Sequence, residues 1–290
     1  MVRTLNIVGC GRVGQTLGRL LHGSGALVLQ DLKGSDLKSA ERAAAFMGAG
    51  KPAARLDDMR PADIWLLTVP DTQIGPVAAA LAASPAARSC KPGRTPVAFH
   101  CSGCLSAEEM AALRTHEFGL ASAHPVFSFA DPAAAVGTFQ STPFGLEGDE
   151  AALQCLRPVL EAIGGACFTI RTTDKPLYHA AAVFSNNFTV VLQAIAREAW
   201  AVAGVPGELA STIQQALLRS TLDSVGRLGP HAITGPAARG DFEVVRAQGT
   251  EVFRWHPEAG ALYQQLSRLA HRLATLKSTY DPDLAEYAGH

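Results

Sequence analysis

The feature that most constrains the fold of this 290-residue chain is a glycine pattern near its start. Gly9, Gly11 and Gly14 follow the apolar run Leu5–Val8 directly and open a helical segment. A tight glycine turn between a strand and a helix lets backbone N–H groups and the helix dipole hold a pyrophosphate. The alternative is a glycine turn that serves helix packing alone. We expect a dinucleotide site formed by Gly9, Gly11, Arg12, Val13 and Gly14.

Short apolar runs alternate with helical stretches such as Ser39–Met47 through the first half of the chain. This alternation is typical of a doubly wound, parallel sheet with helices on both faces. The expected strands are Leu5–Val8, Leu27–Gln30, Ile64–Val69, Val97–His100, Leu120–His124, Phe144–Glu147 and Cys167–Ile170.

Strand patterns end after Arg171, and the rest of the chain has helical periodicity. We expect one long helix over Pro176–Val202, a second from Pro206 to Leu228, and a third marked by leucines between Leu262 and Leu276. The predicted class is α/β followed by all-α. The predicted domains are residues 1–172, a dinucleotide-binding unit, and residues 173–290, a helical unit for substrate and dimer contacts.

Composition excludes several classes of partner. A net charge of -1 leaves no cationic excess for nucleic acid. No apolar run reaches the roughly 18 residues of a membrane span, and no signal peptide precedes the first strand, so we expect a cytoplasmic protein.

Cys101 and Cys104 lack the second ligand pair that structural zinc requires, so we expect no metal. All six cysteines are expected as reduced thiols: Cys10, Cys90, Cys101, Cys104, Cys155 and Cys167.

The end of the second strand decides which dinucleotide is bound. Asp31 can accept a hydrogen bond from a ribose 2′-hydroxyl, whereas Lys33 can hold a 2′-phosphate. Lys33 lies 24 residues after Gly9, where proteins similar to 6-phosphogluconate dehydrogenase carry a phosphate-binding arginine. The alternative is that Asp31 and Lys33 are solvated residues of a turn without a role in binding. NADP is favoured, NAD is possible, and Val69 and Pro70 after the next strand are expected to line the same site.

Polar side chains end two further strands. His100 and Ser102 follow one, and His124 closes the next. Since parallel α/β sheets bind ligands at the carboxyl ends of their strands, we expect His124 to contact substrate or nicotinamide, and His100 and Ser102 to contact substrate. The alternative for each histidine is a satisfied, buried side chain.

The helical half begins with a polar stripe of Lys175, His179, Asn186 and Asn187. Residues seven apart share a helix face, so His179 and Asn186 are expected on one side. Lys175 precedes a proline, which disfavours helical geometry, so we expect it at the helix mouth. This stripe can polarise a substrate carbonyl during hydride transfer, or it is a polar seam between domains.

Several motifs together resemble proteins that pair a Rossmann-like domain with the domain of unknown function 2520. They are GCGRVG, LTVPD, HCSG followed by LS, HPVFSFADP, GLEGD, DKPLYHAAAVFSNNF and TGPAARGD. The resemblance covers nearly the whole chain. It implies the architecture of 6-phosphogluconate dehydrogenase, ketopantoate reductase and prephenate dehydrogenase, with a helical domain that often forms homodimers.

The same resemblance implies roles for Lys175, His179, Asn187 and Arg239, which occupy motif positions. Asn187 matches the helix asparagine that contacts substrate in the ketopantoate and hydroxyacid enzymes. Those enzymes carry a lysine where Val183 stands, so His179 or Lys175 would take its part. Arg239 is expected to bind a substrate carboxylate or, equally, to stabilise a turn with a nearby aspartate.

The leading hypothesis is an NADP-dependent oxidoreductase acting on a small, anionic carbonyl or hydroxyl compound bound between the domains. A sharper form is activity like that of ketopantoate reductase. The alternative class is a dinucleotide-binding sensor or scaffold without turnover, which Val183 favours. A short-chain dehydrogenase is excluded because no tyrosine is followed by a lysine four residues later.

Overall fold

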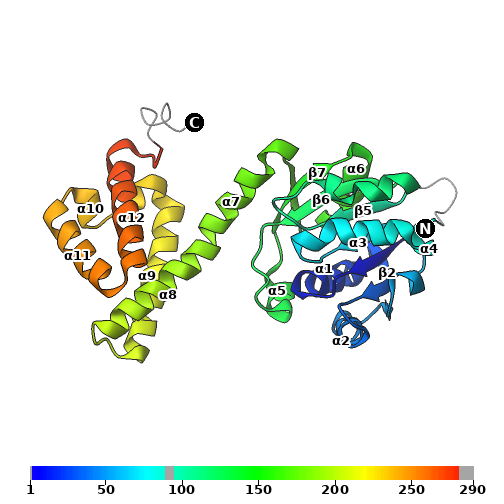
Figure 1. Ribbon diagram of the computed structural model, residues 1–290, viewed down its shortest axis with the longest axis horizontal. Helices are drawn as coiled ribbons and strands as arrows, with labels where there is room; N and C mark the ends of the chain where they lie inside the picture. The colour runs from blue at the N-terminus through cyan, green and yellow to red at the C-terminus, as the bar shows by residue number, and fades with distance from the viewer. Residues whose placement is uncertain (1, 89–94, 281–290) are drawn as a thin grey trace. The chain divides into compact units, whose positions relative to one another are not determined.

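The computed structural model describes residues 2–88 and 95–280, and the chain divides into two compact units, Met1–Asn186 and Asn187–His290. Strands lie in the first unit and the second is helical (Figure 1), which confirms the predicted fold class. The predicted domain border at residue 172 follows the last strand; the compact units divide 14 residues later because α7 (Lys175–Ser185) belongs with the sheet. Cys90 lies outside the described residues.

The first unit is built on an eight-stranded sheet with the order β3-β2-β1-β4-β5-β6-β7-β8. All seven predicted strands are present, with ends shifted by up to three residues, and the short β3 was not predicted. The strands are β1 (Arg3–Val8), β2 (Leu27–Lys33), β3 (Lys51–Pro52), β4 (Ile64–Leu67), β5 (Val97–His100), β6 (Gly119–Pro125), β7 (Pro143–Gly148) and β8 (Ala166–Thr169).

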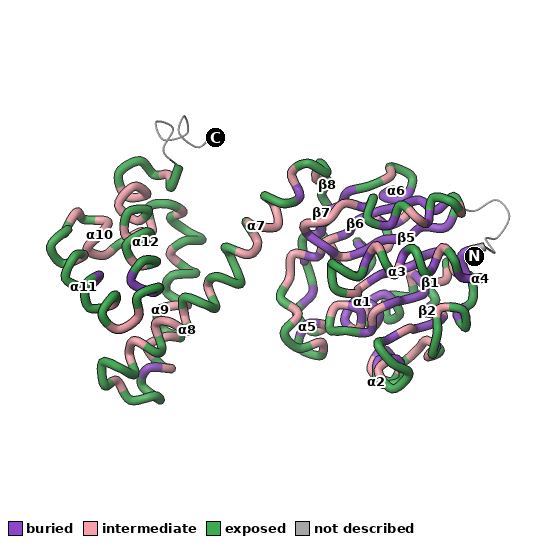
Figure 2. The backbone as a smooth tube through the Cα atoms, in the orientation of Figure 1, coloured by how far each residue is buried: buried purple, intermediate pink, exposed green. Residues whose placement is uncertain are grey.

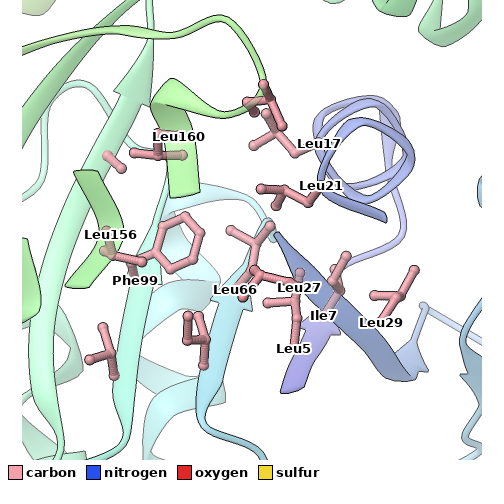
Figure 3. Packing of buried hydrophobic residues seen from close by; sticks show 14 of the residues in the cluster. Leu5, Ile7, Leu17, Leu21, Leu27, Leu29, Leu66, Phe99, Leu156 and Leu160 are labelled. Atoms are coloured by element: carbon pink, nitrogen blue, oxygen red, sulfur yellow. The ribbon is translucent and has the colours of Figure 1, made fainter. Parts of the chain in front are cut away.

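Successive side chains of each strand point to opposite faces of the sheet, and each face is covered by an apolar cluster. In β4, Ile64 and Leu66 pack into one apolar cluster, and Trp65 and Leu67 into the other. Figure 3 shows the first cluster, in which leucines of α1 and α6 meet β1, β2, β4 and β5. The covering helices are α1 (Arg12–Gly23), α2 (Leu37–Met47) and α6 (Glu150–Glu161) on one face, and α3 (Asp71–Ala83), α4 (Pro85–Arg88) and the 3₁₀ segment Ala107–His116 on the other.

One strand pair departs from the parallel sheet that the sequence predicts. β6 and β7 are antiparallel, with His124 paired to Gly145, whereas the other neighbouring pairs are parallel. A parallel return requires a helix that crosses back over the sheet. The helix between these strands, α5 (Pro132–Thr138), packs on α1 instead, so β7 runs back from the carboxyl end of β6.

The long helix predicted over Pro176–Val202 is two helices. α7 ends at Ser185, Asn186 has φ −114° and ψ −66°, and α8 (Asn187–Val202) starts at the next residue. The apolar spacing runs through both segments, so periodicity alone does not reveal the break. Lys175 also differs from its prediction: it is the first residue of α7 with helical φ −55° and ψ −43°, despite the proline that follows.

The second unit consists of helices. The predicted helices from Pro206 to Leu228 and around Leu262–Leu276 are confirmed, while α10 and α11 were not predicted. The helices are α8, α9 (Gly207–Leu228), α10 (Pro236–Arg239), α11 (Phe242–Trp255) and α12 (Pro257–Leu276). Figure 2 shows that buried residues are frequent in the first unit and scarce in this one. Across the described helices, none is long and apolar enough to cross a bilayer.

Candidate functional site

A groove of about 390 Å³ lies where β1, β2 and β4 end. It brings together most of the residues predicted to bind the dinucleotide. Its lining includes Gly9, Gly11, Lys33, Val69 and Pro70. Backbone hydrogen bonds between neighbouring strands fix the strand ends. The Gly9 N–H donates to the Lys33 carbonyl at 2.8 Å, and the Thr68 N–H donates to the Val8 carbonyl at 2.8 Å.

Each glycine of the pattern has a separate structural reason. Gly9 has φ +103°, and a Cβ there would lie 2.5 Å from the Thr68 carbonyl carbon. A side chain on Gly14 would collide with the Gly9 carbonyl and the Thr68 hydroxyl, so this glycine permits close packing of helix on strand. Among the described residues, no atom beyond the chain neighbours of Gly11 lies within 4 Å of its Cβ position. The space at Gly11 is therefore available for a ligand, as a pyrophosphate site requires.

The N-terminus of α1 is suited to an anion. Gly11 is its N-cap and provides no side-chain cap, and no acidic residue occurs in the first turn. Arg12 is exposed and Val13 is partly buried. Uncapped first-turn N–H groups and the helix dipole favour negative charge at this position. Cys10 cannot compete as an anion, because burial raises the pKa of its thiol to about 11.

Asp31 and Lys33, the two residues at the end of β2 that could select the cofactor, have different surroundings in the structure. Asp31 is only 2% exposed, and its carboxylate accepts from the Arg60 backbone N–H at 2.7 Å and from Arg60 Nη2 at 2.6 Å. The same hydrogen bond raises the pKa of Arg60. Asp31 therefore anchors the segment before β4. Lys33 lines the groove, and its ammonium donates to the neighbouring Gly34 carbonyl.

A second group of polar side chains lies at the carboxyl end of β6. His124 Nδ1 is 2.8 Å from the Tyr178 hydroxyl, and the His124 and His179 rings meet edge to face at 5.4 Å. A Cβ on Gly103 would strike both histidine rings, so the loop after β5 lies against them. We call His124, Tyr178 and His179 the histidine cluster. It unites two predicted residues, His124 and His179.

Tyr178 was not predicted as a site residue. A usable signal was present, because Lys175, Tyr178 and His179 stand at i, i+3 and i+4 and therefore share one face of α7. Burial lowers the pKa of His124 to about 4, and the nearby His179 and Lys175 charges contribute. The His124 imidazole is thus neutral at physiological pH.

Lys175 is 1% exposed rather than open at the helix mouth. Its ammonium donates to the Ser122 hydroxyl at 2.8 Å and to the Ser102 carbonyl at 3.2 Å. Burial lowers its pKa, while Glu147 and other acidic groups oppose that shift. Lys175 therefore ties α7 to β6 and to the loop after β5, and supplies positive potential beside the histidine cluster.

His100 and Ser102 are held by hydrogen bonds within the loop after β5 and to its neighbours. His100 is fully buried; its Nδ1 accepts from the Ser102 N–H at 3.1 Å, and its Nε2 lies 2.9 Å from the Ser106 carbonyl. Ser102, 6% exposed, donates from Oγ to Asp71 at 2.7 Å. Burial lowers the pKa of His100, and the hydrogen bond with the Ser106 carbonyl opposes that shift. The predicted substrate contacts of His100 and Ser102 stay predictions.

Asn187 and Arg239 belong to the second unit. Asn187 is the exposed first residue of α8. Arg239 Nε donates to the Asp241 carboxylate at 3.0 Å across the turn after α10. The sequence left two roles open for Arg239, binding a substrate carboxylate or stabilising a turn, and this ion pair matches the second. The predicted substrate contacts of both residues stay predictions.

Cys101 and Cys104 are free thiols, as are the other three described cysteines, Cys10, Cys155 and Cys167. None of these five takes part in a disulfide, and their reduced state stays a prediction. Burial holds the Cys101 thiol protonated by raising its pKa to about 12. Cys101 thus contributes packing in the loop after β5 rather than a reactive thiolate.

Comparison with known proteins agrees with this architecture. Residues 142–270 match the model of a domain of unknown function (DUF2520), which confirms the predicted resemblance. No curated protein matches the chain. A Thermotoga maritima protein of solved structure is 27% identical, with 94% of this chain and 99% of that chain covered and a TM-score of 0.71.

Two further solved structures share the fold at lower identity. A Bacteroides fragilis protein described as a candidate NADP oxidoreductase is 20% identical, with coverage of 93% of this chain and 98% of that chain and a TM-score of 0.74. An imine reductase from Myxococcus stipitatus in complex with NADP+ is 17% identical, with coverage of 99% and 95% and a TM-score of 0.63.

Proposed function

We propose that this chain is an NADP-dependent oxidoreductase that transfers hydride to or from a small, anionic carbonyl or hydroxyl compound. The observation that carries the proposal is the groove at the ends of β1, β2 and β4. There an open glycine, an uncapped helix N-terminus and a lysine converge. The uncapped helix end fits a pyrophosphate and the lysine fits a second phosphate.

The choice of NADP over NAD follows from which charge is available. Asp31 is buried against Arg60, so its carboxylate is not free for a ribose 2′-hydroxyl. Lys33 remains in the groove lining, and exposed Arg12 adds a second cation at the glycine loop. The fold shared with an imine reductase that holds NADP+ and with a candidate NADP oxidoreductase supports a nicotinamide dinucleotide as the cofactor.

A nicotinamide dinucleotide supplies the hydride chemistry when bound. The chain's own contribution is to hold and polarise the reacting oxygen. His124 and His179 present ring nitrogens at the carboxyl end of β6, and Tyr178 orients the first of them. Lys175 lies behind this group and provides positive potential for an oxygen that gains negative charge during the reaction.

Titration with NADPH and NADH, followed by fluorescence, tests the cofactor proposal. We expect Lys33→Ala to weaken NADPH binding by roughly tenfold to a hundredfold, because a hydrogen bond to a charged group is lost. NADH affinity should change by less than about twofold. Exposed Lys51 in the adjacent β3 is outside the groove lining, so Lys51→Ala is the matched control. Binding of neither dinucleotide would refute the proposal.

Turnover distinguishes an enzyme from a binding protein. NADPH oxidation with a panel of 2-keto acids, ketopantoate included, is the direct assay. Robust turnover of one compound supports the proposed reaction class. Tight NADPH binding without turnover of any member favours the sensor or scaffold, which the sequence raised through Val183.

We also propose that the helical unit forms a homodimer. α9 leaves large apolar side chains exposed along its length, and Leu222 is 74% exposed. Several large apolar side chains exposed on one helix suggest an interaction surface. The exposed set on α9 is Leu209, Leu217, Leu222, Val225 and Leu228. Sedimentation equilibrium should give twice the chain mass, and Leu222→Glu should yield monomer; a monomeric wild type would refute the proposal.

A further inference from the structure

Tyr178 and His124 form a contact that the fold prepares from two sides. The Tyr178 hydroxyl lies 2.8 Å from His124 Nδ1, and the two rings are perpendicular with centroids 5.5 Å apart. β7 makes room for this hydroxyl with Gly145, since a Cβ there would lie 2.6 Å from it. Gly145 is also the strand partner of His124. The histidine and the space for its partner are therefore fixed by the same strand pair.

The direction of this hydrogen bond follows from the donors available. Burial raises the pKa of Tyr178 to about 12, so the phenol keeps its proton. In the part of the chain that the structure describes, His124 is the one hydrogen-bond partner found for that hydroxyl. If Nδ1 carried a proton and donated it, the phenolic hydrogen would lack an acceptor in a half-buried position. The phenol therefore donates and Nδ1 accepts.

The other ring nitrogen of His124 is left for a ligand. Its Nε2 has no hydrogen-bond partner among the described residues. Among the described residues, Trp65 Nε1 is the one side-chain polar atom that is both fully enclosed and without a hydrogen-bond partner. His124 Nε2 also lacks a partner, so it is not fully enclosed. Gly103 of the loop after β5 has no side chain, and a Cβ at that residue would lie 3.0 Å from Nε2. Glycine at this position lets the loop approach the ring without placing a side chain against Nε2.

The charged groups around His124 come from two elements, α7 and α3. His179 and Lys175 lie on α7 and disfavour an imidazolium, whereas Asp71 at the start of α3 favours one. Burial and the two α7 groups prevail, so the ring is neutral. A neutral imidazole carries one proton, and Nδ1 is already an acceptor. That proton is then on Nε2.

We propose that Tyr178 is a positioning residue that fixes the His124 proton on Nε2, so that a neutral imidazole donates one hydrogen bond to the reacting oxygen of a carbonyl or alkoxide. The ligand part of this inference rests on the proposed oxidoreductase function; the tautomer does not. Such a donor polarises the oxygen without transferring a proton, a strategy that other enzymes use with a neutral histidine. The general acid that transfers a proton to this oxygen is then a group other than His124.

The imidazole ¹⁵N resonances of histidine-labelled protein test this directly, because the two neutral tautomers and the imidazolium differ in nitrogen shift. His124→Gln assigns the signals among the nine histidines. We expect wild-type His124 in the Nε2–H form throughout pH 5.5–8. In Tyr178→Phe the same ring should become a mixture of tautomers. His179→Gln, which removes the neighbour that contacts the ring only by its edge, should leave the Nε2–H form intact.

An Nδ1–H tautomer or an imidazolium in the wild type at pH 6 would overturn the inference. So would an unchanged, pure Nε2–H form in Tyr178→Phe. The wild-type spectrum alone decides the tautomer if the phenylalanine variant does not fold. All of these spectra are recorded without dinucleotide, so a failed NADPH titration and a failed tautomer assignment are separate results. Where a substrate is known, Tyr178→Phe should lower kcat and leave NADPH affinity within about twofold.

Discussion

The dinucleotide groove and the histidine cluster both lie at carboxyl ends of the same sheet, yet they are built from different parts of the chain. The groove is made largely of backbone and arises from a local pattern around Gly9, Gly11 and Gly14. The cluster is made of side chains, and its central pair, His124 and Tyr178, is 54 residues apart in sequence. A site made of backbone is dictated by small residues, whereas a site made of side chains depends on tertiary packing.

The strongest test of this contrast is Gly9→Ala. The new Cβ would lie 2.5 Å from the Thr68 carbonyl carbon, and an alanine would have to adopt φ +103°. Overpacking and backbone strain together should lower the free energy of unfolding by about 4 kcal/mol. Denaturant unfolding followed by circular dichroism measures the loss.

Gly11→Ala is the matched control in the same loop. No described atom beyond its chain neighbours lies within 4 Å of its Cβ position, so the unfolding free energy should change by less than about 1 kcal/mol. The added methyl instead occupies space proposed for the pyrophosphate, and NADPH affinity should fall at least tenfold. Equal losses of stability in the two variants would show that the glycines do not have the separate roles assigned to them.

The histidine cluster should reveal itself through pH. The pKa of His124 falls from 6.5 to about 4 on folding, so the unfolded chain binds the proton first as pH falls. Stability is therefore complete above pH 6.5 and is lost progressively down to pH 4. One group with this shift contributes about 3 kcal/mol to the unfolding free energy. Urea unfolding at several pH values measures the slope.

His124→Gln provides the reference for that measurement, since glutamine does not titrate. His100, whose pKa burial also lowers, contributes to the slope in both proteins and cancels in the difference. The wild type should lose about 3 kcal/mol more than the variant between pH 6.5 and pH 4. Parallel curves would mean that His124 titrates normally, and the neutral ring would have to be abandoned.

The groove was predictable because its information is local. Strand, glycine loop and helix follow one another within residues 3–23, and Lys33 ends the next strand. The competing roles of Asp31 and Lys33 were not separable from sequence. Arg60, the partner that engages Asp31, is 29 residues away, and no local spacing announces their contact.

The histidine cluster was predictable only in part. His124 and His179 were expected from their places at a strand end and in a helix motif, but Tyr178 gains its role from Gly145 on a strand that runs antiparallel to β6. Sequence periodicity predicted a wholly parallel arrangement there and an unbroken helix through Asn186. Local propensity also misplaced Lys175, because its two buried hydrogen bonds outweigh the bias against a helical residue before proline.

The ion pair between Asp31 and Arg60 limits how cofactor preference can be altered. An engineer who wishes to convert the groove to NADH cannot recruit Asp31 by deleting Lys33, because the carboxylate is held by the Arg60 backbone and side chain in a 2% exposed position. Releasing it would leave an unpaired charge in the interior, with a large penalty. A new carboxylate must instead enter at Lys33 or in the loop that follows, where the chain is already open to the groove.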